Sequence, residues 1–279
     1  EPYAGGLSMS LLEAVTFHDP GPEQRDVFPF GVPAIRSALG GGVRFDAPVT
    51  FLVGENGSGK STFLEGIACA LALPGIGADD PHTDPTLAYG RELAERCKLR
   101  WKLRHPHRGY FFRAEDFFGF TKRMDRLKAE LLADAAEMRN DRHRSEYARN
   151  LGAGVLAGQA RSIEVRYGAA GLDAQSHGEQ FIELFSVRCR PGGIYLMDEP
   201  EAPLSPARQL TFLSMLKAMA EEGSQFIIAT HSPMLLALPG ARILSFDGRE
   251  IRPASYETLE HVQIMRTFLA DPEAYLRHL

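Results

Sequence analysis

Residues 54–62 read GENGSGKST and contain the pattern G-x-x-x-x-G-K-[ST]. Glycines at this spacing allow backbone N–H groups to curl around an anion, and the positive end of a following helix would point at the same place. We expect Lys60 to reach the β- and γ-phosphates of a nucleotide and Ser61 to give a hydroxyl ligand to Mg²⁺. A glycine turn without a ligand is the alternative. The predicted ATP-binding residues are Gly54, Glu55, Asn56, Gly57, Ser58, Gly59, Lys60, Ser61 and Thr62.

Two adjacent carboxylates follow the apolar run IYLM in the segment IYLMDEPE, residues 194–201. A buried strand would bring Asp198 to the edge where the phosphate loop lies, and Asp198 is the expected second Mg²⁺ ligand. Glu199 would then lie one residue further, where it can polarise an attacking water. A helix start outside any strand is the alternative interpretation.

A histidine follows another apolar run, in FIIATHS at residues 226–232. At the carboxyl end of a parallel strand, His231 would face a ligand crevice and could contact a γ-phosphate. A capping or core histidine is the alternative. A fourth segment, SHGEQ at 176–180, places Ser176 and Glu179 at the spacing of a helix-capping box, which also exposes N-terminal amides to a phosphate.

The elements that must position these residues alternate along the chain. Strands are predicted at 49–53, 194–197, 226–229 and 243–246, and helices at 60–73 and 206–223. Because these strands are too apolar to have a wet face, they predict a parallel sheet covered on both sides, an α/β fold. Residues 98–104 alternate basic and apolar, and with 110–112 they predict an antiparallel hairpin. The spacing from Met124 to Met138 predicts an amphipathic helix, and the glycine-rich patches 152–158 and 168–171 are predicted to be connections.

Composition narrows the class of protein. The chain has 279 residues, 44% of them apolar, and three widely spaced cysteines, which disfavours a disulfide scaffold or a zinc module. It contains no apolar run of the roughly 18–20 residues that a membrane span needs and no signal segment at its start. We therefore expect a cytoplasmic protein. Residues 96–149 carry 15 Lys and Arg against 8 Asp and Glu, although the whole chain has a net charge of −5. This basic stretch is either a solvated surface or a contact for DNA or RNA.

In this order, the four segments resemble those of ABC-type ATPases. GENGSGKST looks like Walker A, LMDEP like Walker B with its catalytic glutamate, ATHS like the switch-histidine segment and SHGEQ like the signature motif. The S-x-G-E form is closer to SMC-like ATPases than to most transporters. The series YFFRAEDFF, SHGEQ, DEPEAPLSP and QFIIATHSP resembles compact stand-alone ATPases that are often labelled AAA-family, and the resemblance extends from about Phe28 to the C-terminus.

This resemblance implies a P-loop NTPase fold, an ATPase head with a parallel core sheet, an antiparallel β lobe and a small helical lobe. We expect one domain over 1–279, with its core at 28–95 and 176–255. A β hairpin is expected at about 96–113, a helical lobe at about 114–175 and a C-terminal helical tail at 256–279. The resemblance also implies an ATP-dependent homodimer around two ATP–Mg²⁺. Each site would take Glu199 and His231 as catalytic residues from one chain, and Ser176, Gly178 and Glu179 from the other.

The sequence departs from the family pattern in several places. Only 114 residues separate Ser61 from Ser176, which excludes the long coiled coil of SMC-like proteins. No Q-loop glutamine is evident, and Glu115 is either its replacement or part of a surface salt bridge. Phe28 and Phe30 are candidates for an adenine-stacking aromatic or for core residues. Three couplings stay open: nucleic-acid maintenance or defence, the energy supply of a membrane transporter, and a slow ATP-gated clamp.

Overall fold

A computed structural model describes residues 10–75, 84–102, 108–167 and 177–277, with the side chains of 164–167 left out. Within these ranges, six strands form one sheet in the order β5-β6-β7-β3-β8-β9. All neighbouring pairs are parallel except β8 with β9. The strands are β3 (Val49–Val53), β5 (Gly109–Arg113), β6 (Ile194–Asp198), β7 (Gln225–Ala229), β8 (Arg242–Ser245) and β9 (Arg252–Ala254).

The sheet is parallel because its central strands are apolar on both faces. Every residue of β3 and β7 is buried, and so are the first four of β6. Such strands must be covered from both sides, which is the arrangement of βαβ units. The register sets Arg113, Asp198 and Ala229 side by side at the carboxyl ends of β5, β6 and β7. The predicted parallel core and its strands are therefore confirmed.

One face of the sheet packs against the first part of the chain. Helix α2 (Lys60–Ala70) lies on this face, and its Phe63, Leu64 and Ile67 are fully buried there. A separate antiparallel sheet in the order β2-β1-β4 covers the same core. The other elements on this side are α1 (Pro33–Ser37), α3 (Ala88–Glu95), the 3₁₀ helix Pro85–Leu87, β1 (Leu12–Phe17), β2 (Val43–Arg44) and β4 (Cys97–Trp101).

The opposite face packs against helices from the second half of the chain. Phe181, Leu184 and Phe185 of α6 are buried against the sheet, as the apolar pattern after SHGEQ predicts. Ser205 precedes the first helical residue of α7, Pro206, as predicted. The elements here are α6 (His177–Arg188), α7 (Pro206–Glu221), α8 (Pro233–Leu236) and α9 (Glu260–Ala270); the 3₁₀ helix Tyr256–Thr258 precedes α9, and α10 (Pro272–Leu276) follows it.

The predicted hairpin over 96–113 is wrong. Strand β4 pairs with β1 in the small antiparallel sheet, whereas β5 pairs in parallel with β6 at the edge of the large sheet. The predicted strand with one apolar and one basic face is confirmed over 98–101, because Leu99 and Trp101 are partly buried while Lys98 and Arg100 are exposed. A pattern of period two cannot show which strand is the partner. Leu103 and Arg104 lie outside the described residues.

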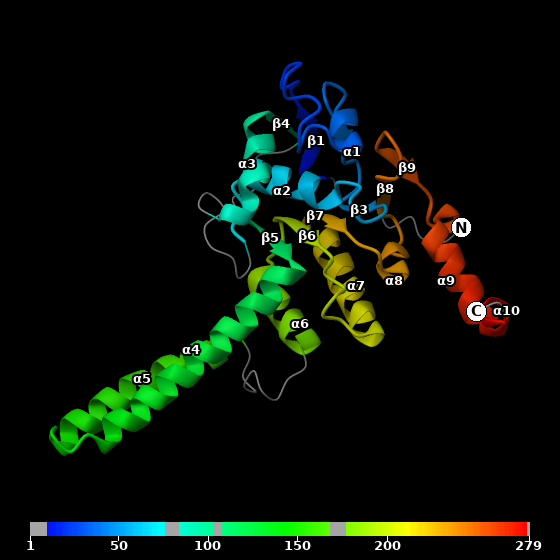
Figure 1. Ribbon diagram of the computed structural model, residues 1–279. Coiled ribbons are helices and arrows are strands. Elements are labelled where there is room, and N and C mark those ends of the chain that lie inside the picture. The colour runs from blue at the N-terminus through cyan, green and yellow to red at the C-terminus, as the bar shows by residue number, and fades with distance from the viewer. Residues whose placement is uncertain (1–9, 76–83, 103–107, 168–176, 278–279) are drawn as a thin grey trace.

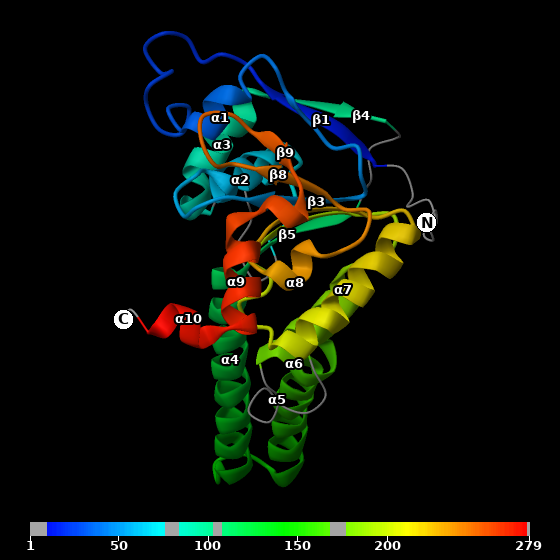
Figure 2. The ribbon, with the colours of Figure 1, turned by 90° about the vertical axis from the view of Figure 1, so that its right-hand side faces the viewer.

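Two long helices, α4 (Ala114–Asn140) and α5 (Glu146–Tyr167), form a hairpin that projects from the sheet (Figures 1 and 2). The amphipathic helix around Met124 to Met138 is confirmed as part of α4. The prediction of a connection at 152–158 is wrong, because these residues lie inside α5; the patch 168–171 lies outside the described residues. Among the helices of the described residues, none has the length and apolar composition of a membrane span.

Candidate functional site

The loop between β3 and α2 has the backbone of an anion-binding turn. Gly54 and Gly59 have φ of +148° and +100°, values that residues other than glycine rarely adopt. A Cβ on Gly59 would lie 2.6 Å from Val32 Cγ1, so the loop also needs glycine there for space. Helix α2 begins at Lys60, so its N-terminal amides face the loop. The predicted strand, loop and helix are confirmed.

Lys60 and Asp247 hold this loop in shape. The Lys60 Nζ donates to the backbone oxygens of Gly54 at 2.6 Å and Glu55 at 2.9 Å. Asp247, just after β8, accepts a hydrogen bond from the Glu55 N–H at 2.8 Å. Burial lowers the pKa of Lys60, although the nearby Asp198 and Glu199 oppose that change. An anion at the loop would therefore restore the favourable surroundings of the ammonium charge.

Asp198 has the features of a metal ligand. Burial raises its pKa to about 6, although a hydrogen bond from the Ser61 side chain lowers it. Its Oδ1 is buried and has no hydrogen-bond partner. A carboxylate oxygen without a partner beside a serine hydroxyl fits Mg²⁺, which prefers oxygen ligands. Ser61 and Asp198 lie together as the sequence predicts, and they would hold the ion between β6 and α2.

Glu199 follows Asp198 in an unusual backbone conformation. Its φ of +51° is rare for a residue with a side chain, and such strain is often kept at functional sites. Hydrogen bonds hold it in place, from the Glu199 N–H to the Ala229 oxygen at 2.9 Å and from the Ala202 N–H to the Glu199 oxygen at 3.1 Å. The Glu199 side chain is about half exposed and can meet a water molecule.

His231 follows β7 and lies beside Glu199, with 4.0 Å between His231 Nε2 and Glu199 Oε1. Its backbone N–H donates to Glu201 Oε1 at 2.8 Å, so the carboxylate of a neighbouring loop fixes the histidine backbone. His231 Nε2 is buried and has no hydrogen-bond partner. Sequence reasoning placed His231 here but did not find Glu201, whose role depends on the loop after β6.

A cavity of about 340 Å³ brings most of these residues together. Phe28 lines it and is 47% exposed, and its ring meets that of Tyr89 edge-on. Phe30 is buried in the core, so Phe28 is the one of the two aromatic candidates that an adenine can reach. The cavity lining consists of Phe28, Val32, Asn56, Gly57, Gly59, Lys60, Ser61, Thr62 and Glu199.

The two signature residues that the structure describes, Gly178 and Glu179, do not line this cavity. Gly178, in the first turn of α6, packs so closely that a Cβ there would lie 2.6 Å from Arg208 Cδ and 2.9 Å from the Pro203 oxygen. Glu179 forms an ion pair with Arg208 of α7. Both residues therefore have a packing role within the chain, whatever they contact outside it. Ser176 lies outside the described residues.

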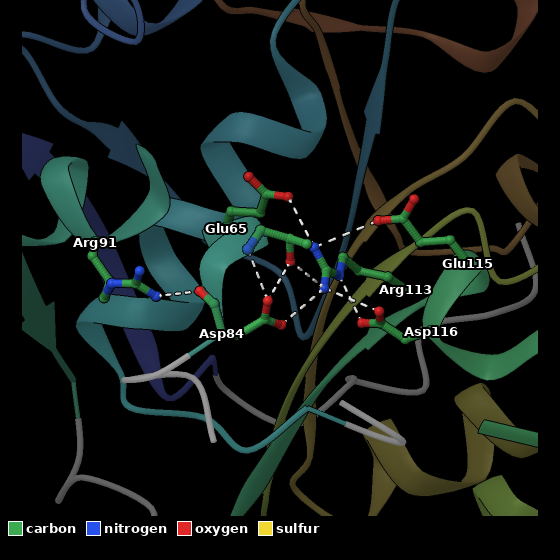
Figure 3. A network of polar contacts seen from close by, with 7 residues as sticks. Glu65, Asp84, Arg91, Arg113, Glu115 and Asp116 are labelled. Carbon is green, nitrogen blue, oxygen red and sulfur yellow. Dashed lines mark hydrogen bonds and ion pairs between the residues drawn. The ribbon is translucent and has the colours of Figure 1, made fainter. Parts of the chain in front are cut away.

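Arg113 ends β5 beside Asp198, two residues before Glu115, the candidate replacement for the Q-loop glutamine. It is almost fully buried and lies among carboxylates from three parts of the chain (Figure 3). The distances are 2.7 Å from Nε to Asp116 Oδ2, 3.3 Å from Nη2 to Asp84 Oδ2 and 3.5 Å from Nη1 to Glu65 Oε1. Glu115, which the sequence leaves as either the Q-loop replacement or part of a surface salt bridge, is 75% exposed and pairs with Arg113 at 3.5 Å.

The Arg113 cluster connects the phosphate-loop helix to the root of the helical hairpin, because Glu65 lies in α2 and Asp116 in α4. Burial raises the pKa of Glu65 to about 7, and the charge of Arg113 only partly opposes this. Nothing in the sequence marks Glu65 or Asp84 as partners of Arg113, since they lie 48 and 29 residues before it, respectively.

Comparisons with known proteins agree with this geometry. Residues 35–131 match the family described as "AAA domain", and residues 180–237 match "AAA domain, putative AbiEii toxin, Type IV TA system". The macrolide export ATP-binding/permease protein MacB of Photorhabdus laumondii subsp. laumondii is 26% identical over 67% of this chain, and that alignment spans 26% of the exporter's length.

Two further relatives are similar to most of this chain. The cytochrome c biogenesis ATP-binding export protein CcmA of Rhodopseudomonas palustris is 29% identical over 69% of this chain and 82% of its own length. A solved nucleotide-free ATP-binding cassette from an ABC transporter aligns with 97% of this chain and 99% of its own, at 15% identity and a TM-score of 0.45. The phosphate loop, the two carboxylates after β6 and these matches agree in making this chain similar to ATPases of the ABC type.

Proposed function

We propose that this chain hydrolyses ATP at the cavity beside the phosphate loop. One observation carries the proposal: Lys60, Ser61 and Glu199, from two separate segments, line the same cavity. Lys60 would neutralise the β- and γ-phosphates, and Phe28 would stack on the adenine. Mg²⁺ held by Ser61 and Asp198 would supply positive charge to the phosphate oxygens.

Glu199 is the proposed general base. Its carboxylate is exposed to the cavity, and it would accept a proton from a water aligned with the γ-phosphate. His231 lies within 4.0 Å of Glu199 and has a free Nε2, so it would contact the γ-phosphate from the same edge of the sheet. Both are proposed roles, supported by position alone.

We further propose that two chains close around two ATP molecules. The trans residues would be Ser176, Gly178 and Glu179, and the two of these that are described lie outside the chain's own cavity. Light scattering on the Glu199→Gln variant tests this. The expected result is a largely monomeric protein without nucleotide and a dimer with ATP and Mg²⁺. An active parent protein whose Glu199→Gln variant never dimerises with ATP would contradict the model.

Nucleic acid is the first candidate for the partner to which ATP hydrolysis is coupled. The basic stretch 96–149 does not form one surface, because β4 and the tip of the α4–α5 hairpin lie at opposite ends of the molecule (Figures 1 and 2). On β4, Arg100 already pairs with Glu13 at 3.0 Å, whereas Lys98 is exposed. Lys122 and Arg126 are exposed on α4 and would contact phosphates there.

An energy-supplying subunit of a membrane exporter is the second candidate. Similarity to the ATP-binding export protein CcmA and to MacB favours it. A membrane partner would bind this chain through a protein surface, so turnover would respond to membranes and not to DNA or RNA. A slow ATP-gated clamp is the third candidate. It would form ATP-dependent dimers and show little ATP turnover with membranes, DNA or RNA.

Turnover measurements with duplex DNA, single-stranded RNA and native-membrane vesicles separate these candidates. The nucleic-acid candidate predicts binding that weakens with salt, and Lys122→Gln with Arg126→Gln should flatten the salt slope by up to about two units. Lys98→Gln is the matched control, because Lys98 is an exposed cation on β4, at the other end of the molecule. The absence of binding to either nucleic acid at low salt would contradict this candidate, and stimulation by vesicles alone would support the exporter.

A further inference from the structure

Helix α5 carries an apolar face that points away from α4. Tyr147, Leu151 and Val155 recur every four residues, and they are 78%, 57% and 54% exposed. The opposite side of α5 contacts α4 and the rest of the hairpin and contains the buried residues Ala153 and Ala160. A row of large apolar side chains with this much exposure indicates a surface that contacts another molecule.

Two glycines lie on the same outward face, between these side chains. Gly154 and Gly158 are exposed, and a Cβ added at either would meet no atom within 4 Å. Neither glycine is therefore required by the packing of the chain itself, and each makes the helix less stable than alanine would. Their effect on the surface is to leave hollows beside Leu151 and Val155 where another helix can approach closely.

We propose that this face pairs with the same face of a second copy of the chain, as an antiparallel helix pair about a two-fold axis. In such a pair each large side chain meets a small residue. Leu151 lies opposite Gly158 of the second copy, Val155 opposite its Gly154, and Tyr147 opposite its Ser162. A single register satisfies all three pairs, which is the self-complementarity that a two-fold interface requires.

The charges favour the same arrangement. Residues 146–163 contain three charged side chains, Glu146, Arg149 and Arg161. Arg149 lies on the hairpin side, where its Nη1 donates to the Arg139 oxygen at 3.4 Å. Glu146 lies seven residues before the buried Ala153 and therefore also on the hairpin side, whereas Arg161 is exposed on the outward face. Antiparallel pairing keeps the two copies of Arg161 at opposite ends of the contact, whereas parallel pairing would bring these like charges together.

The contact is small. From Tyr147 to Ser162 the face is about 22 Å long, because a helix rises about 1.5 Å per residue. One helix pair of this length buries less than the roughly 1,200–2,000 Å² of a stable specific interface. The pair is therefore a weak association that needs no nucleotide, which separates it from the proposed ATP-dependent closure of the heads.

Single-cysteine variants of the full chain test the geometry without ATP. In the antiparallel pair, the two copies of residue 155 are nearly opposite, whereas the two copies of residue 147 lie about 22 Å apart along the helices. Val155→Cys should therefore form a disulfide-linked dimer on oxidation, and Tyr147→Cys should not, each compared with the parent chain and its three native cysteines. Cross-linking of Tyr147→Cys equal to that of Val155→Cys would overturn the antiparallel arrangement.

Sedimentation velocity over a range of protein concentrations tests the contact itself. Gly158→Leu should leave the monomer folded, since its Cβ meets nothing, and should weaken self-association at least tenfold by filling the hollow. Leu132→Lys on α4, also an exposed leucine, is the control and should have no effect. Parent protein that stays monomeric at the highest concentration, or association that Gly158→Leu leaves unchanged, would refute the proposal.

Discussion

Replacing Glu65 by glutamine should change how the stability of the protein depends on pH. Glu65 lies in α2 with its side chain 18% exposed, 3.5 Å from the buried Arg113 (Figure 3). Burial raises its pKa from 4.5 to about 7. Because the folded state holds this proton more tightly than the unfolded state, the neutral carboxyl favours folding at low pH. That contribution is complete below pH 4.5 and is lost as the pH rises through 7.

The size of the effect follows from the shift. A rise from 4.5 to about 7 corresponds to about 3 kcal/mol, because one pKa unit is worth about 1.4 kcal/mol. Most of this, about 2–3 kcal/mol, falls between pH 5 and pH 8. Glutamine keeps the shape and can still accept a hydrogen bond from Arg113, but it does not ionise. The Glu65→Gln variant should therefore gain about 2–3 kcal/mol of stability relative to the parent over this range.

Urea unfolding of both proteins at pH 5, 6, 7 and 8 measures the difference. Subtracting the parent from the variant removes groups that titrate independently of Glu65. Asp198, whose pKa is raised to about 6, interacts with Glu65, and relief of this repulsion adds to the gain in the same direction. Glu115→Gln is the matched control, because Glu115 also pairs with Arg113 but is 75% exposed, and its effect should stay below about 1 kcal/mol. A stability difference for Glu65→Gln that does not change with pH, or that falls, would refute the reasoning.

Three further outcomes are expected. Gln225→Leu should destabilise the protein by about 2–5 kcal/mol in urea unfolding, because the Gln225 amide accepts from the Leu11 and Leu12 N–H groups and donates to the Leu12 oxygen, all buried. An unchanged midpoint would contradict it. Phe28→Ala should raise the KM for ATP about tenfold with little change in kcat, whereas Phe28→Tyr should restore it; equal affinity in all three proteins would remove Phe28 from the site. Gly59→Ala should lower ATP affinity at least about tenfold in calorimetry, because its φ of +100° is strained for alanine, and full affinity would show that the loop tolerates the change.

The sequence was informative where local pattern and chemistry coincide. The run before Gly54 and the run before Asp198 are apolar on both faces, so they had to be buried strands, and parallel strands place their carboxyl ends at one edge. That reasoning is enough to bring Lys60, Asp198 and His231 together. The residues that fix the site more finely, Asp247 and Glu201, act through hydrogen bonds between distant segments, and no local pattern marks them.

The errors also have physical causes. The basic and apolar alternation at 98–101 predicts a strand correctly but does not identify its partner, which is β1 and not β5. Glycines suggested a connection at 152–158, but the cost of a glycine in a helix is small enough for the contacts between α4 and α5 to override it. Arg113 could not be placed because its partners Glu65 and Asp84 are distant in sequence and become neighbours only in the fold.

The central claim is that Lys60 and Glu199 serve one ATP site in different roles. Equilibrium ATP binding and steady-state turnover, measured on the same preparations of Lys60→Ala and Glu199→Gln, test it directly. Lys60→Ala should lose both binding and turnover, because the charge that neutralises the phosphates is gone. Glu199→Gln should bind ATP like the parent while turnover falls at least about 10²-fold. If Glu199→Gln loses ATP affinity as fully as Lys60→Ala, or keeps the turnover of the parent, the assignment of the catalytic base is wrong.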